Sequence, residues 1–125
     1  MLFRSLGDGP QPLPAVEIVP AGGWFDYAAR YTAGTTEYYA PARLPEASAR
    51  AVASAAVTAH QALGLRDLSR SDLIVDPSGQ VFFLEANVAP GMTDTSTLPM
   101  ALEAAGRDFG TLCRDLLLVA AARGD

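Results

Sequence analysis

The hydrophobic pattern along the chain alternates between strand-like and helix-like segments, and it predicts one mixed domain. The segment Ala15–Val19 reads AVEIV, an alternation around β-branched residues that is typical of a strand. From Pro45 the chain is rich in Ala, with Pro45 suited to a first helical turn and Gly64 to the position after the last one. The predicted order is a loop or frayed leader over 5–14, a strand over 15–19, an irregular loop with one helical turn over 20–35, a strand over 36–42, a helix over 45–63, a hairpin over 72–88, a polar loop over 89–97, and helices over 98–105 and from 109 to about 123, the last capped by Asp108.

The hairpin is the most informative segment. Two apolar stretches flank Asp76–Gly79, and the order Asp, Pro, Ser, Gly is that of a type I turn between antiparallel strands. Because both strands are mostly apolar on both faces, we expect the hairpin to lie inside a covered sheet.

Composition excludes several classes of function. The 125 residues form one domain of ordinary size, and the net charge of −5 argues against nucleic acid as a partner. All nine basic residues are Arg, which excludes Schiff-base chemistry and a lysine-bearing phosphate loop. A single Cys and a single His exclude an internal disulfide, a multi-cysteine zinc site and a histidine-rich metal site. The longest apolar run, Leu116–Ala122, is far shorter than the roughly 20 residues of a membrane span, so we expect a soluble, cytoplasmic protein with no membrane partner.

Three oxygen-bearing side chains interrupt the apolar hairpin strands. Glu85 and Asn87 are two residues apart and leave the same face of one strand, whereas Asp72 lies on the partner strand. If the register brings Asp72 to that face, three oxygen ligands converge, as a hard cation such as Mg²⁺ prefers. The alternative is a set of polar residues at a solvated strand end.

Neighbouring residues have two readings each. Arg70 projects on the same side as Asp72, either as a structural salt bridge or as a donor for developing negative charge. The loop after Asn87 offers backbone N–H groups and hydroxyls to an anion, or it is an ordinary capping loop in which Ser96 or Thr97 caps the next helix. We expect His60 to pack or lie at the surface of its helix, and Cys113 to be a buried, inert thiol.

As a whole, these segments resemble the D-alanine–D-alanine ligases of the ATP-grasp superfamily. Residues 69–100, SRSDLIVDPSGQVFFLEANVAPGMTDTSTLPM, are similar to the family's R-x-D strand, hairpin, E-x-N-x-x-P-G-M-T loop and serine before a proline. Residues 24–42, WFDYAARYTAGTTEYYAPA, resemble its tyrosine-rich loop and the strand that follows, with AVEIVP in front. The fold class implied is α/β (α+β in detail): the C-terminal subdomain of an ATP-grasp fold, with a mainly antiparallel sheet covered by helices.

The resemblance implies a reaction and a role for each matching residue. Such enzymes phosphorylate the carboxylate of one D-alanine with ATP, and the amine of a second D-alanine attacks the acyl phosphate, giving a dipeptide for peptidoglycan and hence for the cell wall and cell shape. The resemblance implies that Asp72, Glu85 and Asn87 ligate two Mg²⁺ ions, with Mn²⁺ as an alternative, and that Glu85 and Asn87 also bind the nucleotide. It implies oxyanion stabilisation by Arg70 and the Gly91 N–H, and binding of the second substrate's carboxylate by Ser96. Three further roles are implied: ordering of the active-site loop by Tyr31, phosphate contact by Arg30, where the family usually has Lys, and apolar contact beneath the adenine by Leu84.

Length is the main departure from the family. The resemblance implies partners besides ATP and D-alanine: an N-terminal domain and a lid, in the same polypeptide or as a separate chain. We therefore expect residues 1–14 to be a leader or loop continuing that N-terminal part, and 15–125 to be the catalytic subdomain, whose sheet exposes apolar surface that a lid would cover. The alternatives are a non-catalytic Mg²⁺-nucleotide-binding or protein-binding remnant, and another ATP-grasp carboxylate–amine ligase.

Overall fold

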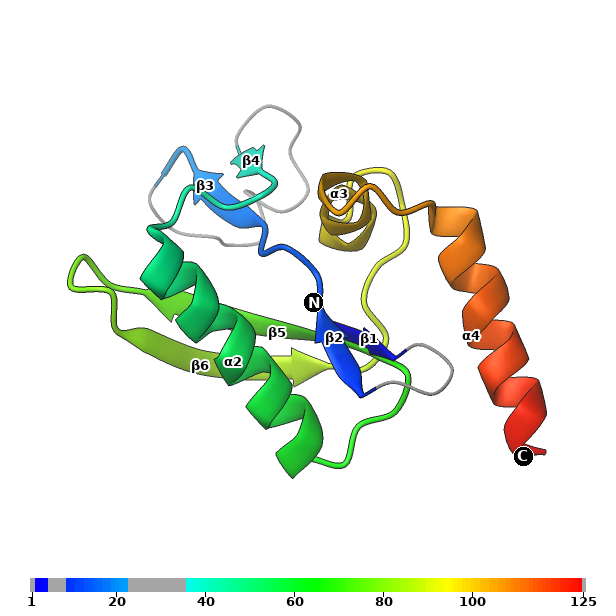
Figure 1. Cartoon of the computed structure of the whole chain (residues 1–125). Coiled ribbons are helices and arrows are strands. Elements are labelled where there is room, and N and C mark those ends of the chain that lie inside the picture. Colours follow the sequence, from blue (N-terminus) through cyan, green and yellow to red (C-terminus); the bar gives the residue numbers. More distant parts are fainter. Residues whose placement is uncertain (1, 5–8, 23–35, 125) are drawn as a thin grey trace.

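The computed structural model describes residues 2–4, 9–22 and 36–124, which form two small antiparallel sheets and three helices (Figure 1). The elements are β1 (Leu2–Arg4), β2 (Pro10–Pro12), β3 (Glu17–Pro20), β4 (Thr36–Tyr39), α2 (Glu46–Ala62), β5 (Leu68–Val75), β6 (Val81–Asn87), α3 (Thr97–Ala104) and α4 (Phe109–Arg123). The larger sheet has the strand order β2-β1-β5-β6, and β3 pairs with β4 in the smaller one. The mixed, mainly antiparallel fold class is confirmed.

The first two strands differ from the sequence prediction. Residues Pro10–Pro12 lie in β2, where the composition predicts a loop, and β2 pairs with β1 antiparallel. β1 in turn pairs with β5, with Phe3 opposite Leu68. Pro and Gln within a short segment indicate a loop locally, and the pairing of β2 with β1, which β5 anchors in the sheet, overrides that preference.

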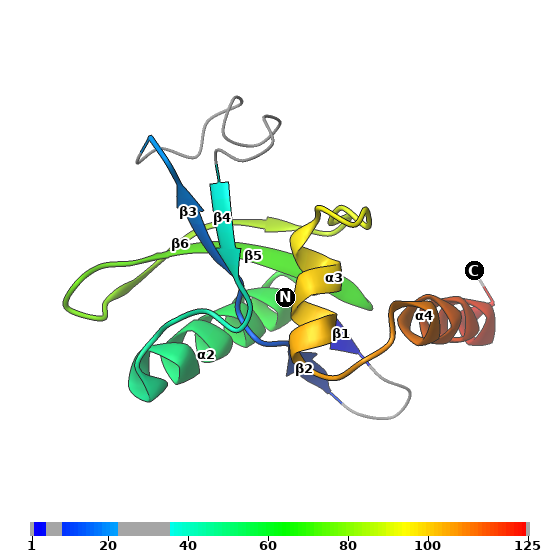
Figure 2. The ribbon, with the colours of Figure 1, turned by 90° about the horizontal axis from the view of Figure 1, so that it is seen from above.

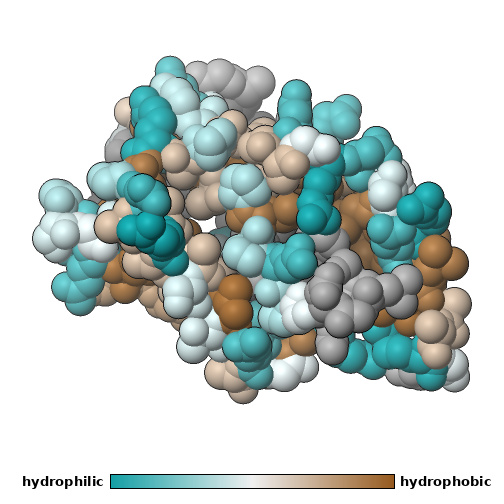
Figure 3. All heavy atoms as spheres, in the orientation of Figure 1, coloured by the Kyte–Doolittle hydropathy of each residue, from teal (hydrophilic) through white to brown (hydrophobic). Residues whose placement is uncertain are grey.

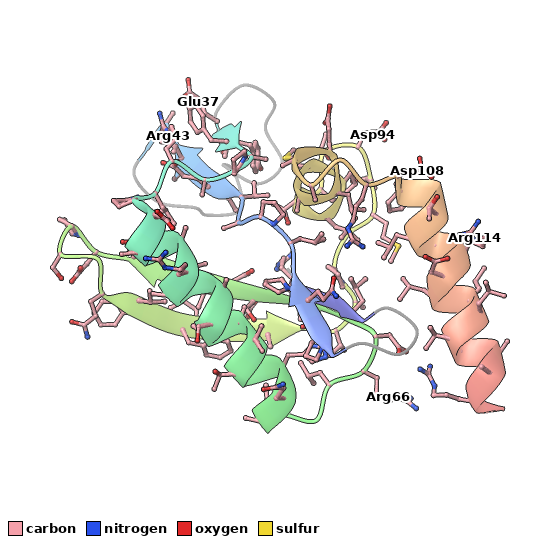
Figure 4. All side chains as sticks on the ribbon, viewed as in Figure 1. Glu37, Arg43, Arg66, Asp94, Asp108 and Arg114 are labelled. Atoms are coloured by element: carbon pink, nitrogen blue, oxygen red, sulfur yellow. The ribbon has the colours of Figure 1, made fainter. Side chains whose placement is uncertain are left out.

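The helices begin and end close to the predicted positions because their caps are local. Pro45 is the N-cap residue of α2, and Gly64, one residue past its C-cap, has a φ of 60° that favours glycine. At α4, the Asp108 carboxylate accepts a hydrogen bond of 2.7 Å from the Thr111 N–H, which confirms the predicted cap (Figure 4). That bond and a second one to the side chain of Thr111 hold the pKa of Asp108 below its usual value.

The β3–β4 sheet is braced by an arginine. Arg43 forms a fork with Glu17, with Nε 3.0 Å from Oε2 and Nη2 2.9 Å from Oε1, and its guanidinium carbon lies 3.4 Å from the centre of the Tyr39 ring. The fork lowers the pKa of the Glu17 carboxyl. Arg43 lies beside Glu37 on this hairpin, away from the larger sheet (Figure 4).

The hairpin β5–β6 has the predicted turn and an irregularity that the sequence does not reveal. The Gly79 N–H donates to the Asp76 carbonyl at 2.9 Å, and Gly79 has a φ of 88°. Asp72 lies opposite Glu85 whereas Leu73 lies opposite Phe83, so Leu84 is an extra residue in a β-bulge.

The hairpin has a packed face and an open face. His60 of α2 is buried and its Nδ1 lies 2.7 Å from Ser69 Oγ, so Ser69 and the alternate residues Ser71 and Leu73 face α2. Figure 2 shows α2 along one side of the hairpin, α3 near the end that is far from the turn, and α4 beyond that end. His60 is thus a packing residue, as expected.

The main core lies at that far end. Leu68, the first residue of β5, packs with residues of α3, of α4 and of the segment after β2. The buried members of this cluster are Leu13, Leu68, Leu98, Ala101, Leu102 and Leu112. Cys113 is free and only half-buried, so the expectation of a buried thiol is wrong: Leu112, not its neighbour, turns toward the core.

Apolar side chains remain exposed in two places. Ile74 and Phe82, opposite one another near the hairpin turn, are 53% and 45% exposed, so the prediction of a sheet covered on both faces is wrong there, and the expectation of exposed apolar surface is confirmed. Leu117 and Leu118 are exposed on α4, where Figure 3 shows apolar surface. Within the described part of the chain, none of the helices combines the length and apolarity needed to cross a membrane.

Candidate functional site

The register of the hairpin brings four of the predicted site residues onto one face. Arg70 lies opposite Asn87 and Asp72 lies opposite Glu85, and directly opposed residues of an antiparallel pair project to the same side. Since residues two apart on a strand also share a side, all four side chains leave the face that is turned away from α2. The sequence alone leaves open whether Asp72 shares the face of Glu85 and Asn87. The pairing of β5 with β6 places it on that face.

The bulge at Leu84 decides this arrangement. In a regular ladder continued from the Leu73–Phe83 pair, Leu84 would stand opposite Asp72 and Glu85 opposite Ser71. Glu85 would then project toward α2, beside the apolar residues that pack there. The extra residue shifts the register by one and returns Glu85 and Asn87 to the open face.

Solvent exposure increases along the open face of β5. Leu68 is buried in the core, the Arg70 side chain is 23% exposed, the Asp72 side chain 32% and Ile74 53%. Glu85 is the most exposed of the charged group, at 61%. The cluster therefore lies between a dry core and open solvent, where charges are reachable by a ligand but less screened than at a free surface.

Arg70 lies between the two carboxylates. Its Nε is 2.7 Å from Asp72 Oδ1 and its Nη2 is 2.9 Å from Asp72 Oδ2, a two-pronged fork, and the same Nη2 is 3.7 Å from Glu85 Oε1. The structural salt bridge that the sequence suggested is thus present. A single cationic group already serves both carboxylates.

Asn87 is fixed by the loop that follows β6. Its Oδ1 accepts a hydrogen bond of 2.8 Å from the Ala89 N–H. A backbone N–H identifies the amide oxygen, so the side-chain orientation is settled, and one lone pair of Oδ1 remains for another partner.

The residues fit a hard cation in kind. Two carboxylates and one amide oxygen on a shared face are ligands of the type that Mg²⁺ takes, and Arg70 demonstrates that positive charge is accommodated between the carboxylates. Over the described ranges no three residues among His, Cys, Asp and Glu gather as a metal cluster, so a cation here would use the Asn87 oxygen and oxygens of a bound ligand or water as well.

The loop between β6 and α3 is organised around Ser96. Its Oγ accepts from the Thr93 N–H at 3.2 Å and lies 2.9 Å from Thr93 Oγ1, which is itself 3.3 Å from Thr95 Oγ1. Ser96 occupies the N-cap position of α3 but its side chain makes no capping bond, so the expectation that it caps the helix is wrong. The hydroxyl is turned into the loop instead, where Asp94 lies at the outer turn (Figure 4).

Gly91 is in contact with Ser96. A Cβ on Gly91 would lie 2.6 Å from Ser96 Oγ, closer than van der Waals contact allows. Glycine at this position therefore makes room for the serine hydroxyl. Both predicted loop residues thus belong to one small cluster, and Thr93, which the sequence analysis did not single out, completes it.

Apolar residues adjoin the charged cluster toward the hairpin turn. Ile74 and Phe82 share its face by register, and Leu84 is 58% exposed at the bulge. Leu84 was predicted from the sequence, whereas Ile74 and Phe82 were not. Ile74 could have been found, because it is two residues from Asp72 on one strand and therefore shares its face. A flat apolar group could lie beside the charges here.

The remaining predicted residues, Arg30 and Tyr31, lie outside the described residues. Open grooves lie elsewhere on the described part of the chain: one of about 520 Å³ is lined by Tyr38, Ala40, Met100, Glu103 and Ala104, between β4 and α3. The candidate site is therefore a face and a loop edge rather than a closed pocket.

Comparison with known proteins identifies the family of this arrangement. The family model described as the D-ala D-ala ligase C-terminus matches residues 5–118. A D-alanine–D-alanine ligase of Anaeromyxobacter sp. (strain Fw109-5) is 51% identical over 105 residues, which cover 84% of this chain and 34% of the relative. One of Pelotomaculum thermopropionicum is 46% identical over 111 residues, covering 89% and 35%.

Solved structures agree with the sequence matches. The VanG D-Ala:D-Ser ligase of Enterococcus faecalis superposes with a TM-score of 0.76 at 32% identity, over 93% of this chain and 33% of that one. The D-alanine–D-alanine ligase of Bacillus anthracis gives 0.68 at 31% identity, over 84% and 34%. These neighbours have the ATP-grasp fold, and the chain spans about a third of the length of the curated relatives it matches. With a matching family model over most of its length, the chain belongs to the D-alanine–D-alanine ligase family, of which it carries the C-terminal part of the ATP-grasp fold.

Proposed function

We propose that this chain supplies the nucleotide-phosphate and second-substrate side of an ATP- and Mg²⁺-dependent ligase that joins two D-alanines. The observation that carries the proposal is the register of β5 and β6, because it gathers Arg70, Asp72, Glu85 and Asn87 on one accessible face. The rest of the site would come from the parts of the fold that the relatives have in addition, in the same polypeptide or as a separate chain.

In this proposal the phosphates of ATP lie over the charged cluster. Asp72, Glu85 and Asn87 would hold two Mg²⁺ ions, which would supply positive charge to neutralise the phosphates during transfer. The terminal phosphoryl group passes from ATP to the carboxylate of the first D-alanine, giving an acyl phosphate and ADP. Leu84 and the exposed pair Ile74 and Phe82 offer an apolar surface to the adenine beside the phosphates.

The second half-reaction uses Arg70 and the loop. The amine of the second D-alanine attacks the acyl carbon, the carbonyl oxygen becomes an oxyanion, and phosphate leaves as the amide forms. Arg70 and the Gly91 N–H donate to that oxyanion, while Ser96 donates to the carboxylate of the second D-alanine. The ordering role of Tyr31 and the phosphate contact of Arg30 complete the proposal. A cytoplasmic location, where ATP is available, and a place in peptidoglycan synthesis accompany it.

The first experiment measures ligation in a completed enzyme. By this we mean the 125-residue chain mixed or co-expressed with a polypeptide carrying the other two-thirds of the 51% identical relative. Phosphate release from ATP is followed with D-alanine, D-serine and a panel of other amino acids. D-Serine is included because one structural neighbour is named a D-Ala:D-Ser ligase. Release that depends on D-alanine, with D-alanyl-D-alanine as the product, would support the proposal.

The decisive variant is Glu85→Gln, because it removes the charge of a proposed metal ligand. Glu85 is largely exposed, so the fold should be unaffected, whereas ligation should fall by at least about 10³-fold. Glu103→Gln, on the exposed side of α3, is the matched control and should ligate normally.

Other outcomes would overturn the proposal in distinct ways. Mg²⁺-nucleotide binding without phosphate release under any amino acid would favour a non-catalytic binding module. Release with a different amino acid pair would make the chain part of another carboxylate–amine ligase. Normal ligation by Glu85→Gln would remove the metal role from the cluster.

A further inference from the structure

Arg70 occupies the place between Asp72 and Glu85 that the proposed cation would share. We propose that Arg70 acts as a built-in counter-ion that disfavours a lone divalent cation and yields the carboxylates only when nucleotide phosphates offer its guanidinium another partner. Arg70 would thereby make cation binding conditional on the nucleotide. This inference rests on the proposed metal role of Asp72 and Glu85.

The fork between Arg70 and Asp72 uses both oxygens of the carboxylate. Both oxygens of Asp72 receive a hydrogen bond from Arg70, at 2.7 and 2.9 Å, and such two-pronged, charge-assisted pairs are the strong members of their class. A cation that approached Asp72 would have to displace the guanidinium or share oxygens with it.

The group formed by Asp72, Glu85 and Arg70 is not electrically neutral. Asp72 and Glu85 carry two negative charges, and Arg70, within 3.7 Å of both, carries one positive charge. A divalent ion added to this group would lie next to the guanidinium, and the two positive charges would repel one another at partly buried positions where screening is reduced. Nucleotide phosphates bring several negative charges, which removes that penalty and gives the Arg70 fork a matching acceptor.

The molecule holds a second arginine–carboxylate fork that can be compared with that of Arg70. Arg43 makes the same kind of fork with Glu17, at 3.0 and 2.9 Å, but on the smaller sheet and with its side chain 55% exposed, against 23% for Arg70. Its cation–π contact with Tyr39 gives it a bracing role in the hairpin. Arg43 therefore provides a control with the same charge and the same fork outside the site.

The test is Mn²⁺ binding to the 125-residue chain, measured by electron paramagnetic resonance of the free ion, first without nucleotide. Arg70→Gln should bind Mn²⁺ on the order of 10-fold more tightly than the unchanged chain, because the competing cation is gone. Arg43→Gln should match the unchanged chain within about twofold, since its charge is remote and screened. Arg70→Lys, which keeps the charge but not the fork, should lie between the two.

A second series with a non-hydrolysable ATP analogue completes the test. With the analogue bound, the advantage of Arg70→Gln should disappear, because the phosphates now engage Arg70 in the unchanged chain. Asp72→Asn should lose Mn²⁺ binding in both series, and thermal unfolding of each variant verifies that it is folded.

The outcomes separate this inference from the proposed function. If Asp72→Asn loses Mn²⁺ but Arg70→Gln binds it no more tightly than the unchanged chain, the metal role stands and the counter-ion role of Arg70 is wrong. If neither the unchanged chain nor Arg70→Gln binds Mn²⁺, with or without nucleotide, both the metal site and the inference are wrong. Tighter binding that persists unchanged with the analogue would overturn the conditional part.

Discussion

The two faces of the β5–β6 hairpin come from the same strands but place their polar groups in opposite circumstances. On the face toward α2, Ser69 is buried and paired with His60 at 2.7 Å. On the open face, the side chains of Arg70 and Asp72 are 23% and 32% exposed and are paired with each other. Ser69 on the packed face thus makes its side-chain hydrogen bond within the fold, whereas the open face holds charges that a ligand can reach.

The comparison teaches that stability and chemistry are assigned to alternate residues of one strand. Changes at odd-numbered positions of β5 should leave ligand binding intact, and any effect they have should be on unfolding. Changes at Arg70 or Asp72 should do the reverse, because partly exposed ion pairs contribute little to folding.

After Glu85→Gln, the largest effect is expected at Arg70. Arg70→Ala should slow ligation by the completed enzyme by on the order of 10²–10³-fold, the loss typical of removing one oxyanion donor. Tighter binding of lone Mn²⁺ should accompany the slower reaction. Arg43→Ala, which removes a similar fork from the smaller sheet, is the control and should ligate at the unchanged rate. A near-normal rate for Arg70→Ala would leave its open-face pair with a structural role only.

Gly91→Ala should give a smaller effect that is specific to the second substrate. The new Cβ would lie 2.6 Å from Ser96 Oγ and would push the hydroxyl out of its place. We expect the KM for the second D-alanine to rise about 10-fold, with a smaller change in kcat, because a misplaced binding group costs affinity before it costs chemistry.

The control for Gly91→Ala is Gly22→Ala, where no described atom lies within 4 Å of the added carbon. Gly22→Ala should behave like the unchanged enzyme. An unchanged KM for Gly91→Ala would show that Ser96 does not hold the second substrate, whatever the contact between the two residues.

Two serines on the packed face provide a matched pair for stability. Ser69→Ala removes the hydrogen bond to His60 and should lower the free energy of unfolding by about 1 kcal/mol. Ser71 Oγ is buried and, among the described residues, has no hydrogen-bond partner, so Ser71→Ala should leave stability unchanged or raise it by up to about 1 kcal/mol. Urea unfolding measures both, and Mn²⁺ binding should be the same in both variants. A loss of Mn²⁺ binding in either would break the division between the faces.

How much of this could be predicted from the sequence depends on the range of the interactions involved. The start of α4 followed from Asp108 and the turn from Asp76–Gly79, since caps and turns are decided by neighbours. The shared face of Asp72 and Glu85 could not be predicted, because it depends on the bulge at Leu84 and a bulge leaves no signal in the alternation of residues.

Candidate chemistry was visible for a related reason. Polar residues within apolar strands, such as Asp72 and Glu85, are conspicuous at the level of composition alone. The sequence also offered a salt bridge for Arg70, but neither its two-pronged geometry with Asp72 nor the contact of Gly91 with Ser96 was visible, because both depend on side-chain positions that only the folded backbone fixes. The strand Pro10–Pro12 was missed because it forms by pairing with β1 in the sheet. Its own residues do not favour a strand.

The smallest effect concerns a carboxylate that serves structure alone. The hydrogen bond from the Thr111 N–H lowers the pKa of Asp108, so the ionised form is favoured in the folded chain. A lowered folded-state pKa gives stability that is present above the unfolded value of about 3.9 and lost as the pH falls through the folded value. Asp108→Asn keeps a capping oxygen but does not titrate. The difference in unfolding free energy between the unchanged chain and this variant should therefore be constant near neutral pH and shift against the unchanged chain below about pH 4. A difference that stays constant down to pH 2 would mean that the charge of the Asp108 carboxylate does not stabilise the folded chain. Asp108 would then no longer contrast with Asp72, whose charge we expect to matter for cation binding and not for folding.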